Sequence, residues 1–333
     1  MTVATEDPWE KGKAMWQELL ALRIAPGKVL RVSVPDGRVD TLVEAAGPAP
    51  DGVVVDSGTV YWTTMGVPVI DPSAGSGEAS SDFSRRNGGV HAVNLDGSGQ
   101  RDVLPDGSIT TGKQLTSDGA GLLYWGDREG CRVSRARVDG TGLTDLIVNT
   151  PDDGQTQECV GVAVDPVRGH LYWTQKGPAK GGVGRILRAG IEIPDGGSAG
   201  RRPDVEELWT GLPEPIDLHI DGDWLYWTDR GTPPAGNTLN RAPLPGPGRA
   251  GTPPEILAGG FAEAIGLAVD GEAGIAYVSD LGGHIRAVPL PGGPADGGAE
   301  REIVSLPFPL TGLCGIGGVG GVGGVGEVGG VGS

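Results

Sequence analysis

One pattern recurs five times along this chain and restricts what it can fold into. Each copy has an apolar run, a turn built on Asp or Gly, and a strand-like segment that begins with Tyr and usually continues with Trp. All five tyrosines of the chain fall at the same point of the repeat: Tyr61, Tyr124, Tyr172, Tyr226 and Tyr277. Self-similarity at this period is typical of repeat architectures such as propellers and solenoids.

The segments after each Tyr-Trp strand predict two more strands per repeat. They alternate apolar and polar residues and turn at Asp-Gly or similar pairs, as in HAVNLDGSGQRDVL from His91. The content of 62 Gly and 27 Pro also favours turns over long helices. A four-stranded meander cannot bury both faces alone, so the copies must stack radially with their aromatic pairs between sheets. We therefore predict an all-β, six-bladed β-propeller with four antiparallel strands per blade.

The sixth blade is predicted to come from both ends of the chain. LTGLCGIGG from Leu310 has the form of an innermost strand, and KVLRVSVPDGRVDTLV from Lys28 has the form of two outer strands. Closing the ring in this way hides strand edges that would otherwise be exposed. The chain is therefore predicted to have three parts. A helical N-terminal extension spans residues 1–27 and the propeller spans 28–316. A Gly/Val-rich tail over 317–333 is a degenerate strand or disordered. The helix is predicted from a cap at Asp7-Pro8 and from apolar residues up to Leu20.

With these repeats in view, the sequence resembles the YWTD propellers of low-density lipoprotein receptors, the class B repeats. LYWTD at 225–229, NLDGS at 94–98 and PDG at 50–52 carry the resemblance, which covers nearly the whole chain. It also resembles intracellular bacterial and fungal members of this superfamily. The resemblance implies that Asp229, with Asp127 and Asp280, ties adjacent blades together. No signal peptide, Cys-rich module or membrane span is expected from this sequence, so the resemblance is not extended to receptor function.

Charge and cysteine content restrict the partners. A net charge of −17 disfavours nucleic acid and anionic membrane surfaces. The acidic N-terminus and the absence of a long apolar stretch predict a cytoplasmic protein. The three cysteines are expected to be reduced thiols. No GxGxxG lies between a strand and a helix, so a nicotinamide dehydrogenase is not expected.

Three loops are extended, and all are expected on one face of the ring. They run over Thr63–Gly89, Thr174–Gly182 and Thr228–Thr238, and such insertions usually bind a partner or are disordered. Glu158, Glu214 and Glu263 occupy equivalent positions before three inner strands on this face. We expect these carboxylates to meet around the channel mouth.

Two further polar residues, Asp217 and Gln114, replace glycines of the other repeats. Clustered acids either raise one another's pKa and act as general acid or base, or hold a cation such as Ca²⁺ through Glu158, Glu214 and Glu263. They can equally be solvated carboxylates bonded to nearby amides. The basic residues that follow the Tyr-Trp strands would orient an anionic substrate together with Gln114, or pair with the acids; they are Arg128, Lys176 and Arg230.

Nucleophilic catalysis is disfavoured, because none of the four histidines adjoins a Ser or Cys motif. His219 lies near Asp217 by strand alternation and is a candidate for proton transfer. Cys159 is more typical of a buried apolar residue than of a nucleophile.

Two functions remain open. The first is a cytoplasmic small-molecule enzyme that uses carboxylate acid/base chemistry in cyclisation, isomerisation, elimination (lyase) or hydrolysis. The bias toward Gly, Val, Asp and Arg suggests a place in bacterial specialised metabolism. The second is a non-catalytic scaffold that binds a protein or peptide on the same face.

Overall fold

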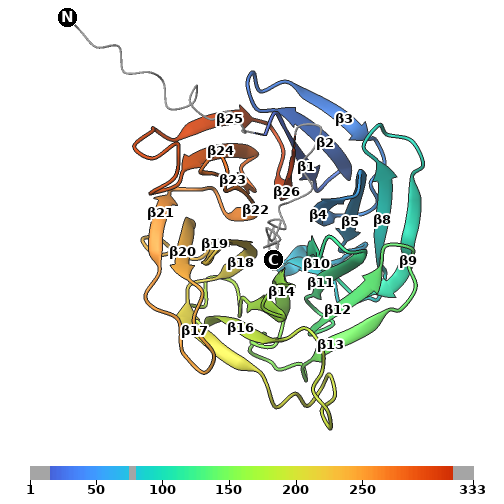
Figure 1. Ribbon diagram of the computed structural model, residues 1–333. Helices are drawn as coiled ribbons and strands as arrows, with labels where there is room; N and C mark the ends of the chain where they lie inside the picture. The colour runs from blue at the N-terminus through green and yellow to red at the C-terminus, as the bar shows by residue number, and fades with distance from the viewer. Residues whose placement is uncertain (1–15, 75–79, 318–333) are drawn as a thin grey trace, which may run out of the picture.

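The chain forms a ring of six four-stranded antiparallel sheets, as the repeat predicts (Figure 1). The computed structural model describes residues 16–74 and 80–317. Neighbouring inner strands contact one another around the whole ring, from blade 1 to blade 6 and back to blade 1. The first strand of each blade lies nearest the axis, and the fourth lies at the rim.

Blades 1 to 3 follow one another along the chain. Blade 1 consists of β4 (Pro50–Asp56), β5 (Thr59–Thr64), β8 (Gly88–Asn94) and β9 (Arg101–Ile109). Blade 2 consists of β10 (Gly112–Ser117), β11 (Leu122–Asp127), β12 (Arg132–Arg137) and β13 (Thr144–Val148). Blade 3 consists of β14 (Cys159–Asp165), β15 (His170–Gln175), β16 (Gly184–Gly190) and β17 (Glu206–Leu212).

Blades 4 and 5 complete the regular series, and blade 6 closes it. Blade 4 consists of β18 (Pro215–Asp221), β19 (Trp224–Asp229), β20 (Thr238–Pro243) and β21 (Glu255–Gly259). Blade 5 consists of β22 (Ala264–Asp270), β23 (Ile275–Asp280), β24 (His284–Pro289) and β25 (Arg301–Ser305). Blade 6 consists of β26 (Leu310–Ile316), β1 (Glu18–Arg23), β2 (Lys28–Ser33) and β3 (Val39–Val43).

Blade 6 confirms the predicted closure and corrects the predicted N-terminal helix. Its inner strand β26 comes from the C-terminal side and pairs with β1 from the N-terminal side, red against blue in Figure 1. Leu19, Leu20 and Leu22 are therefore strand residues that occupy the place of a Tyr-Trp strand. The cap-like Asp7-Pro8 and the apolar residues up to Leu20 favour a helix in the sequence, but pairing with β26 and β2 makes the segment a strand. Residues 1–15, with the predicted cap at Asp7, and the tail from 318 lie outside the described residues.

A side-chain hydroxyl joins neighbouring inner strands in four blades. It accepts a hydrogen bond from an amide of its own inner strand and donates one to a carbonyl of the next inner strand. In blade 4, Asp217 N donates to Thr228 Oγ1 (3.1 Å), which donates to the carbonyl of Ile265 (2.7 Å). The same two bonds are made by Thr63, Thr174 and Ser279.

The Asp of the motif fixes the connection between blades, as the resemblance implies. Asp229 accepts hydrogen bonds from the amides of Glu214 and Gly231, and Asp127 accepts from those of Thr110 and Thr111. Asp280 does the same with Ala262 and His284. These aspartates hold the loops that enter the inner strands on one face of the ring. We call it the loop face; it carries Glu158, Glu214 and Glu263.

The long loop after β5 lies on the loop face and forms a small hairpin. β6 (Val69–Ile70) pairs with β7 (Ser81–Asp82), and a 3-10 turn, η1, spans Pro72–Ala74. Residues 75–79 of this loop are outside the described part of the chain.

Thr228→Val tests the hydroxyl relay. The substitution keeps the shape but leaves the Asp217 amide and the Ile265 carbonyl without their partner, so the free energy of unfolding should fall by about 2 kcal/mol. Urea denaturation measures the change. Thr210→Val, on an exposed position of β17, is the matched control and should alter stability by less than about 0.5 kcal/mol. Equal effects of the two substitutions would contradict a structural role for the relay.

Candidate functional site

The predicted acids lie where the inner strands begin, and two of them come together. Glu214 and Glu263 immediately precede β18 and β22 on the loop face. Arg230 bridges their carboxylates, at 2.7 Å from Glu214 and 3.8 Å from Glu263. Lys180 also contacts both, through its amide to Glu214 (2.9 Å) and its ammonium to Glu263 (3.3 Å). Glu158 precedes β14 and is buried, and its charge adds to burial in raising the pKa of Cys131 to about 11.

Glu214 is a buried counter-ion. Its side chain is 0% exposed, and Arg230 donates to it from Nε (2.8 Å) while Lys176 Nζ lies 3.4 Å away. Two cations therefore neutralise a carboxylate that was predicted to repel its neighbours. No three Asp, Glu, His or Cys side chains over 16–74 and 80–317 are grouped so that they could hold a metal. Glu158, Glu214 and Glu263 are therefore not grouped as ligands of one ion, and a role of these residues in binding Ca²⁺ stays a prediction.

The predicted basic residues pair with acids. Arg128 donates from Nε and Nη2 to one carboxylate oxygen of Glu129 and lies 5.7 Å from the centre of the Phe83 ring. Lys176 and Arg230 pair with Glu214. All three cations are at most 9% exposed. The sequence left two roles open for these cations, orienting an anionic substrate or pairing with acids, and the structure shows the pairing. A substrate role for these cations stays a prediction.

A closed layer of side chains lies below these ion pairs. It takes one residue from each inner strand: Asp51, Lys113, Val160, Ile216, Ile265 and Thr311. The three apolar members pack together, and Leu281 covers them from the loop face. We call this the axial layer. All six residues are buried.

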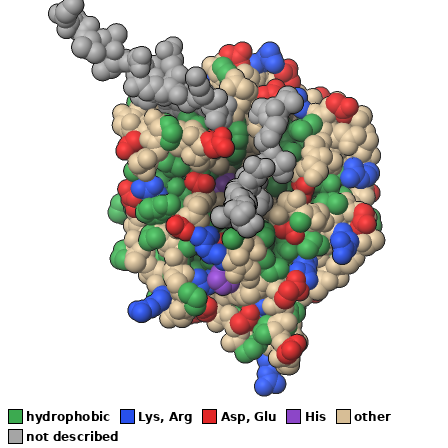
Figure 2. Space-filling view, viewed as in Figure 1, with side chains coloured by type: hydrophobic (Ala, Val, Ile, Leu, Met, Phe, Trp, Pro, Cys, Tyr) green, Lys and Arg blue, Asp and Glu red, His purple; other side chains and the backbone are tan. Residues whose placement is uncertain are grey.

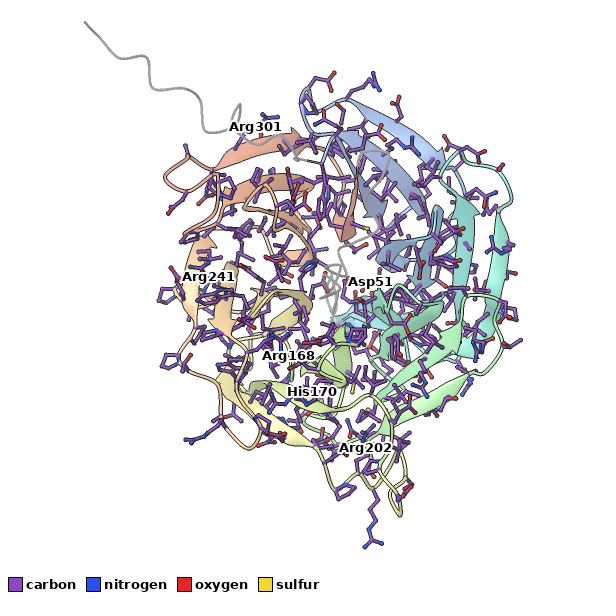
Figure 3. The ribbon with its side chains drawn as sticks, in the orientation of Figure 1. Asp51, Arg168, His170, Arg202, Arg241 and Arg301 are labelled. Atoms are coloured by element: carbon purple, nitrogen blue, oxygen red, sulfur yellow. The ribbon has the colours of Figure 1, made fainter. Side chains whose placement is uncertain are left out.

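The polar half of the axial layer was missed in the sequence. Asp51, beside the axis in Figure 3, accepts from Lys113 Nζ at 2.7 Å and from Gln114 Nε2 at 3.1 Å. Burial lowers the pKa of Lys113, and the Asp51 charge opposes this shift. In the sequence, Asp51 belongs only to the PDG of the family resemblance, and no pattern distinguishes Lys113. Gln114 thus contacts Asp51 rather than a position open to the loop face.

Asp217 lies one residue further along β18, where most blades have Gly. A Cβ at Gly52, Gly161 or Gly266 would lie 2.4 Å or less from backbone atoms of the next inner strand. Asp217 instead uses its carboxylate there: Oδ1 accepts from Leu218 N and Oδ2 from Leu267 N, both at 2.9 Å. Burial raises its pKa to about 8, and the negative charge of Asp51 contributes.

His219 lies on the same side of β18 as Asp217, two residues further from the loop face. The surrounding protein removes most of the water around the ring, and this desolvation lowers its pKa to about 4, so the imidazole is neutral at pH 7. Its side chain is partly exposed, as are those of Val54, Thr116 and Cys314 at the equivalent positions of their strands. Solvent therefore reaches this level of the axis, although the axial layer is buried.

Cysteine and surface chemistry add little to this site. Cys131, Cys159 and Cys314 are free thiols, as predicted, and burial raises the pKa of each.

On the face seen in Figure 2, acidic and basic side chains are interspersed around the ring. In the described part of the chain, no helix is long and apolar enough to cross a membrane.

Fold and motif together define a six-bladed propeller of the YWTD class. The chain is 41% identical over 279 residues to low-density lipoprotein receptor-related protein 1 of Pyricularia oryzae, covering 78% of this chain and 84% of that protein. This chain belongs to the YWTD propeller family of low-density lipoprotein receptor-related proteins. No family model matches it.

Two further comparisons extend this result. The chain is 37% identical over 284 residues to the 3-hydroxyacyl-CoA dehydrogenase-like protein LAM1 of Cochliobolus heterostrophus, covering 80% of this chain but 56% of that protein. A propeller in the crystal structure of a nidogen/laminin complex superposes with a TM-score of 0.62 at 19% identity, covering 89% of this chain and 97% of that one. The latter likeness concerns the fold alone.

Glu214→Gln tests the buried ion pairs. The amide cannot balance the charges of Lys176 and Arg230, so the free energy of unfolding should fall by about 3 kcal/mol. Glu263→Gln is the matched control, because Glu263 is 42% exposed and its loss should cost less than about 1 kcal/mol. Chemical denaturation of both variants gives the comparison, and a Glu214→Gln protein as stable as the control would contradict the assignment.

The pKa of Asp217 predicts a pH dependence of stability. A carboxyl whose pKa rises on folding binds its proton more tightly in the folded state, so stability falls as pH rises from about 4 to 8. One group accounts for at most about 1.4 kcal/mol per pH unit. Asp217→Asn should remove this component, so its stability relative to the parent protein should increase with pH. Urea midpoints at pH 5, 6, 7, 8 and 9 measure it.

The exposed Asp195 supplies the control for this titration. Asp195→Asn should leave the pH profile unchanged. A parallel shift of the Asp217→Asn profile, with no change of slope, would mean that Asp217 is ionised throughout.

Proposed function

We propose that this protein is a small-molecule enzyme of the non-redox acid/base type, with Asp217 and His219 as its reactive groups. One observation carries the proposal: a carboxyl group with a raised pKa and a neutral imidazole lie on the same side of one inner strand, near the axis. At pH 7 Asp217 retains its proton and can donate it. His219 has its lone pair available and can accept one.

The placement of the two groups suits a reaction in which a proton is removed and another is returned. Residues two apart in a strand are separated by roughly 7 Å, a distance that one small substrate can span to contact both side chains. His219 would take a proton from the substrate, and Asp217 would give one to the leaving or rearranging atom. Isomerisation and elimination both balance in this way, and hydrolysis does so with water as the attacking group.

Backbone hydrogen bonds support the role of Asp217 by fixing its orientation. Both carboxyl oxygens accept from main-chain amides of β18 and β22.

The described part of the chain has strands and one short 3-10 turn, with no strand–helix unit of the kind that binds a dinucleotide. The proposal is therefore a non-redox reaction, although the name of one relative contains the word dehydrogenase.

A second candidate function is a scaffold that binds a protein on the loop face. The hairpin β6–β7 favours it, because Val67 and Ile70 are 58% and 57% exposed and Val69 is 38% exposed beside them. The propeller in the nidogen/laminin complex shows that a ring of this shape occurs in such an assembly. Binding through this hairpin would not require Asp217 or His219.

Turnover of cell metabolites tests the enzyme proposal. Purified protein is incubated with an extract from cells that lack its gene, and mass spectrometry follows compounds that disappear. His219→Gln should reduce the rate at least about 100-fold, because general base catalysis contributes factors of this size. His170 is the first residue of β15, next to the turn that follows β14, so His170→Gln is the control and should retain activity.

The same variants separate the two functions. A His219→Gln protein that converts the compound at the parental rate would refute the role of His219. If no compound is consumed and a protein is captured by the parent but not by Ile70→Asp, the scaffold is the function.

A further inference from the structure

A cavity of about 310 Å³ lies on the flank of the ring, between the outer parts of blades 2 and 3. The end of β13, the outer strands of blade 3 and the long connection from β16 to β17 form its walls. The tip of this connection is held against blade 2 by a hydrogen bond from Val148 N to the carbonyl of Ala199 (2.9 Å). Arg202, which lines the cavity, lies at the periphery of the ring in Figure 3. The cavity is separate from the axis and from the proposed reactive groups.

The indole of Trp173 lines this cavity and has an unsatisfied donor. Trp173 is 1% exposed, and its Nε1 has no hydrogen-bond partner within the described residues. The equivalent ring in blade 1, Trp62, donates from Nε1 to the carbonyl of Ala46 at 2.8 Å. A buried N–H that lacks an acceptor is unfavourable, and an oxygen atom supplied from the cavity would satisfy it.

The charges around the cavity favour an anion. Arg185, Arg201 and Arg202 line it, against one acid, Glu207. Arg185 pairs with Glu207 at 2.6 Å, and Arg202 is engaged by Asp204 at 2.7 Å.

Arg201 differs from the other two arginines. Its side chain is exposed and makes no ion pair with the described residues. Ile147, Leu187 and Val205 supply apolar wall between these polar groups.

We propose that this cavity binds a small organic acid. One carboxylate oxygen accepts from the indole N–H of Trp173, the other meets the guanidinium of Arg201, and the apolar body packs against Ile147 and Leu187. The volume is at the lower end of the range for ligand pockets, which restricts the occupant to a small molecule. This second site does not depend on the proposed reaction at the axis.

Binding of phenylacetate to the full chain tests the proposal, with the uncharged phenylacetamide as the ligand control. Calorimetry should show binding of phenylacetate at least tenfold tighter than that of the amide, because charge-assisted hydrogen bonds are lost with the charge. Arg201→Gln should weaken phenylacetate about tenfold. Arg137→Gln, an exposed arginine of β12 outside the cavity, should leave it unchanged.

Indole N–H signals in ¹⁵N NMR spectra locate the ligand directly. Trp173→Phe identifies its own signal by loss, and in the parent protein that signal should move when phenylacetate is added. Trp125 is a matched control, since its Nε1 also lacks a partner but its ring does not line the cavity. No binding, equal binding by Arg201→Gln, or movement of the Trp125 signal alone would overturn the proposal. The assay is independent of turnover, so its failure would leave the axial site untouched.

Discussion

The hydroxyl relay between inner strands is the contact on which the ring depends. Each hydroxyl joins an amide of one strand to a carbonyl of the next, so both backbones must approach closely around the axis. The neighbouring position on the inner strand then has no room for a Cβ, which explains Gly52, Gly161 and Gly266. Blade 2 has Gly126 where the hydroxyl is expected, and a Cβ there would lie 2.4 Å from the carbonyl of Val160. In blade 6 the inner strand supplies the hydroxyl itself, because Thr311 donates to the carbonyl of Pro50 at 2.8 Å.

Departures from the repeat are informative because the relay leaves so little room at the axis. Asp217 occupies a position where most blades have Gly. Its carboxylate accepts a hydrogen bond from Leu267 N of the next inner strand, which adds an interaction between blades 4 and 5. Gln114 at the equivalent place contacts blade 1 through Asp51. The two substitutions give the ring polar groups where its other blades contribute only backbone. Polar side chains at this position are therefore features of single blades and not of the repeat.

The sequence predicts the architecture well because the same strand and turn pattern occurs in several repeats, and each copy supports the same fold. The five Tyr-Trp-type strands, their turns and the shared sixth blade follow from the sequence. The residues of β1 instead follow a cap-like Asp-Pro and favour a helix, although they form a strand. The site was only partly predictable. The positions of Glu214 and Arg230 relative to their strands predict that both lie at the loop face. They do not predict which side chains contact each other. Asp51 and Lys113 form a buried pair across two blades, and no spacing rule connects residues so far apart in the chain.

Charge pairing explains how the loop face holds a fully buried acid. Burying Glu214 alone would be very unfavourable, and Arg230 and Lys176 offset this by close contacts. Such pairs add little net stability compared with apolar packing, but they require one arrangement of the entering loops. The apolar half of the axial layer, Val160, Ile216 and Ile265, needs no such pairing. Blades 1 and 2 contribute charge to this layer and blades 3 to 5 contribute apolar volume, so the axis is asymmetric although the fold is a repeat.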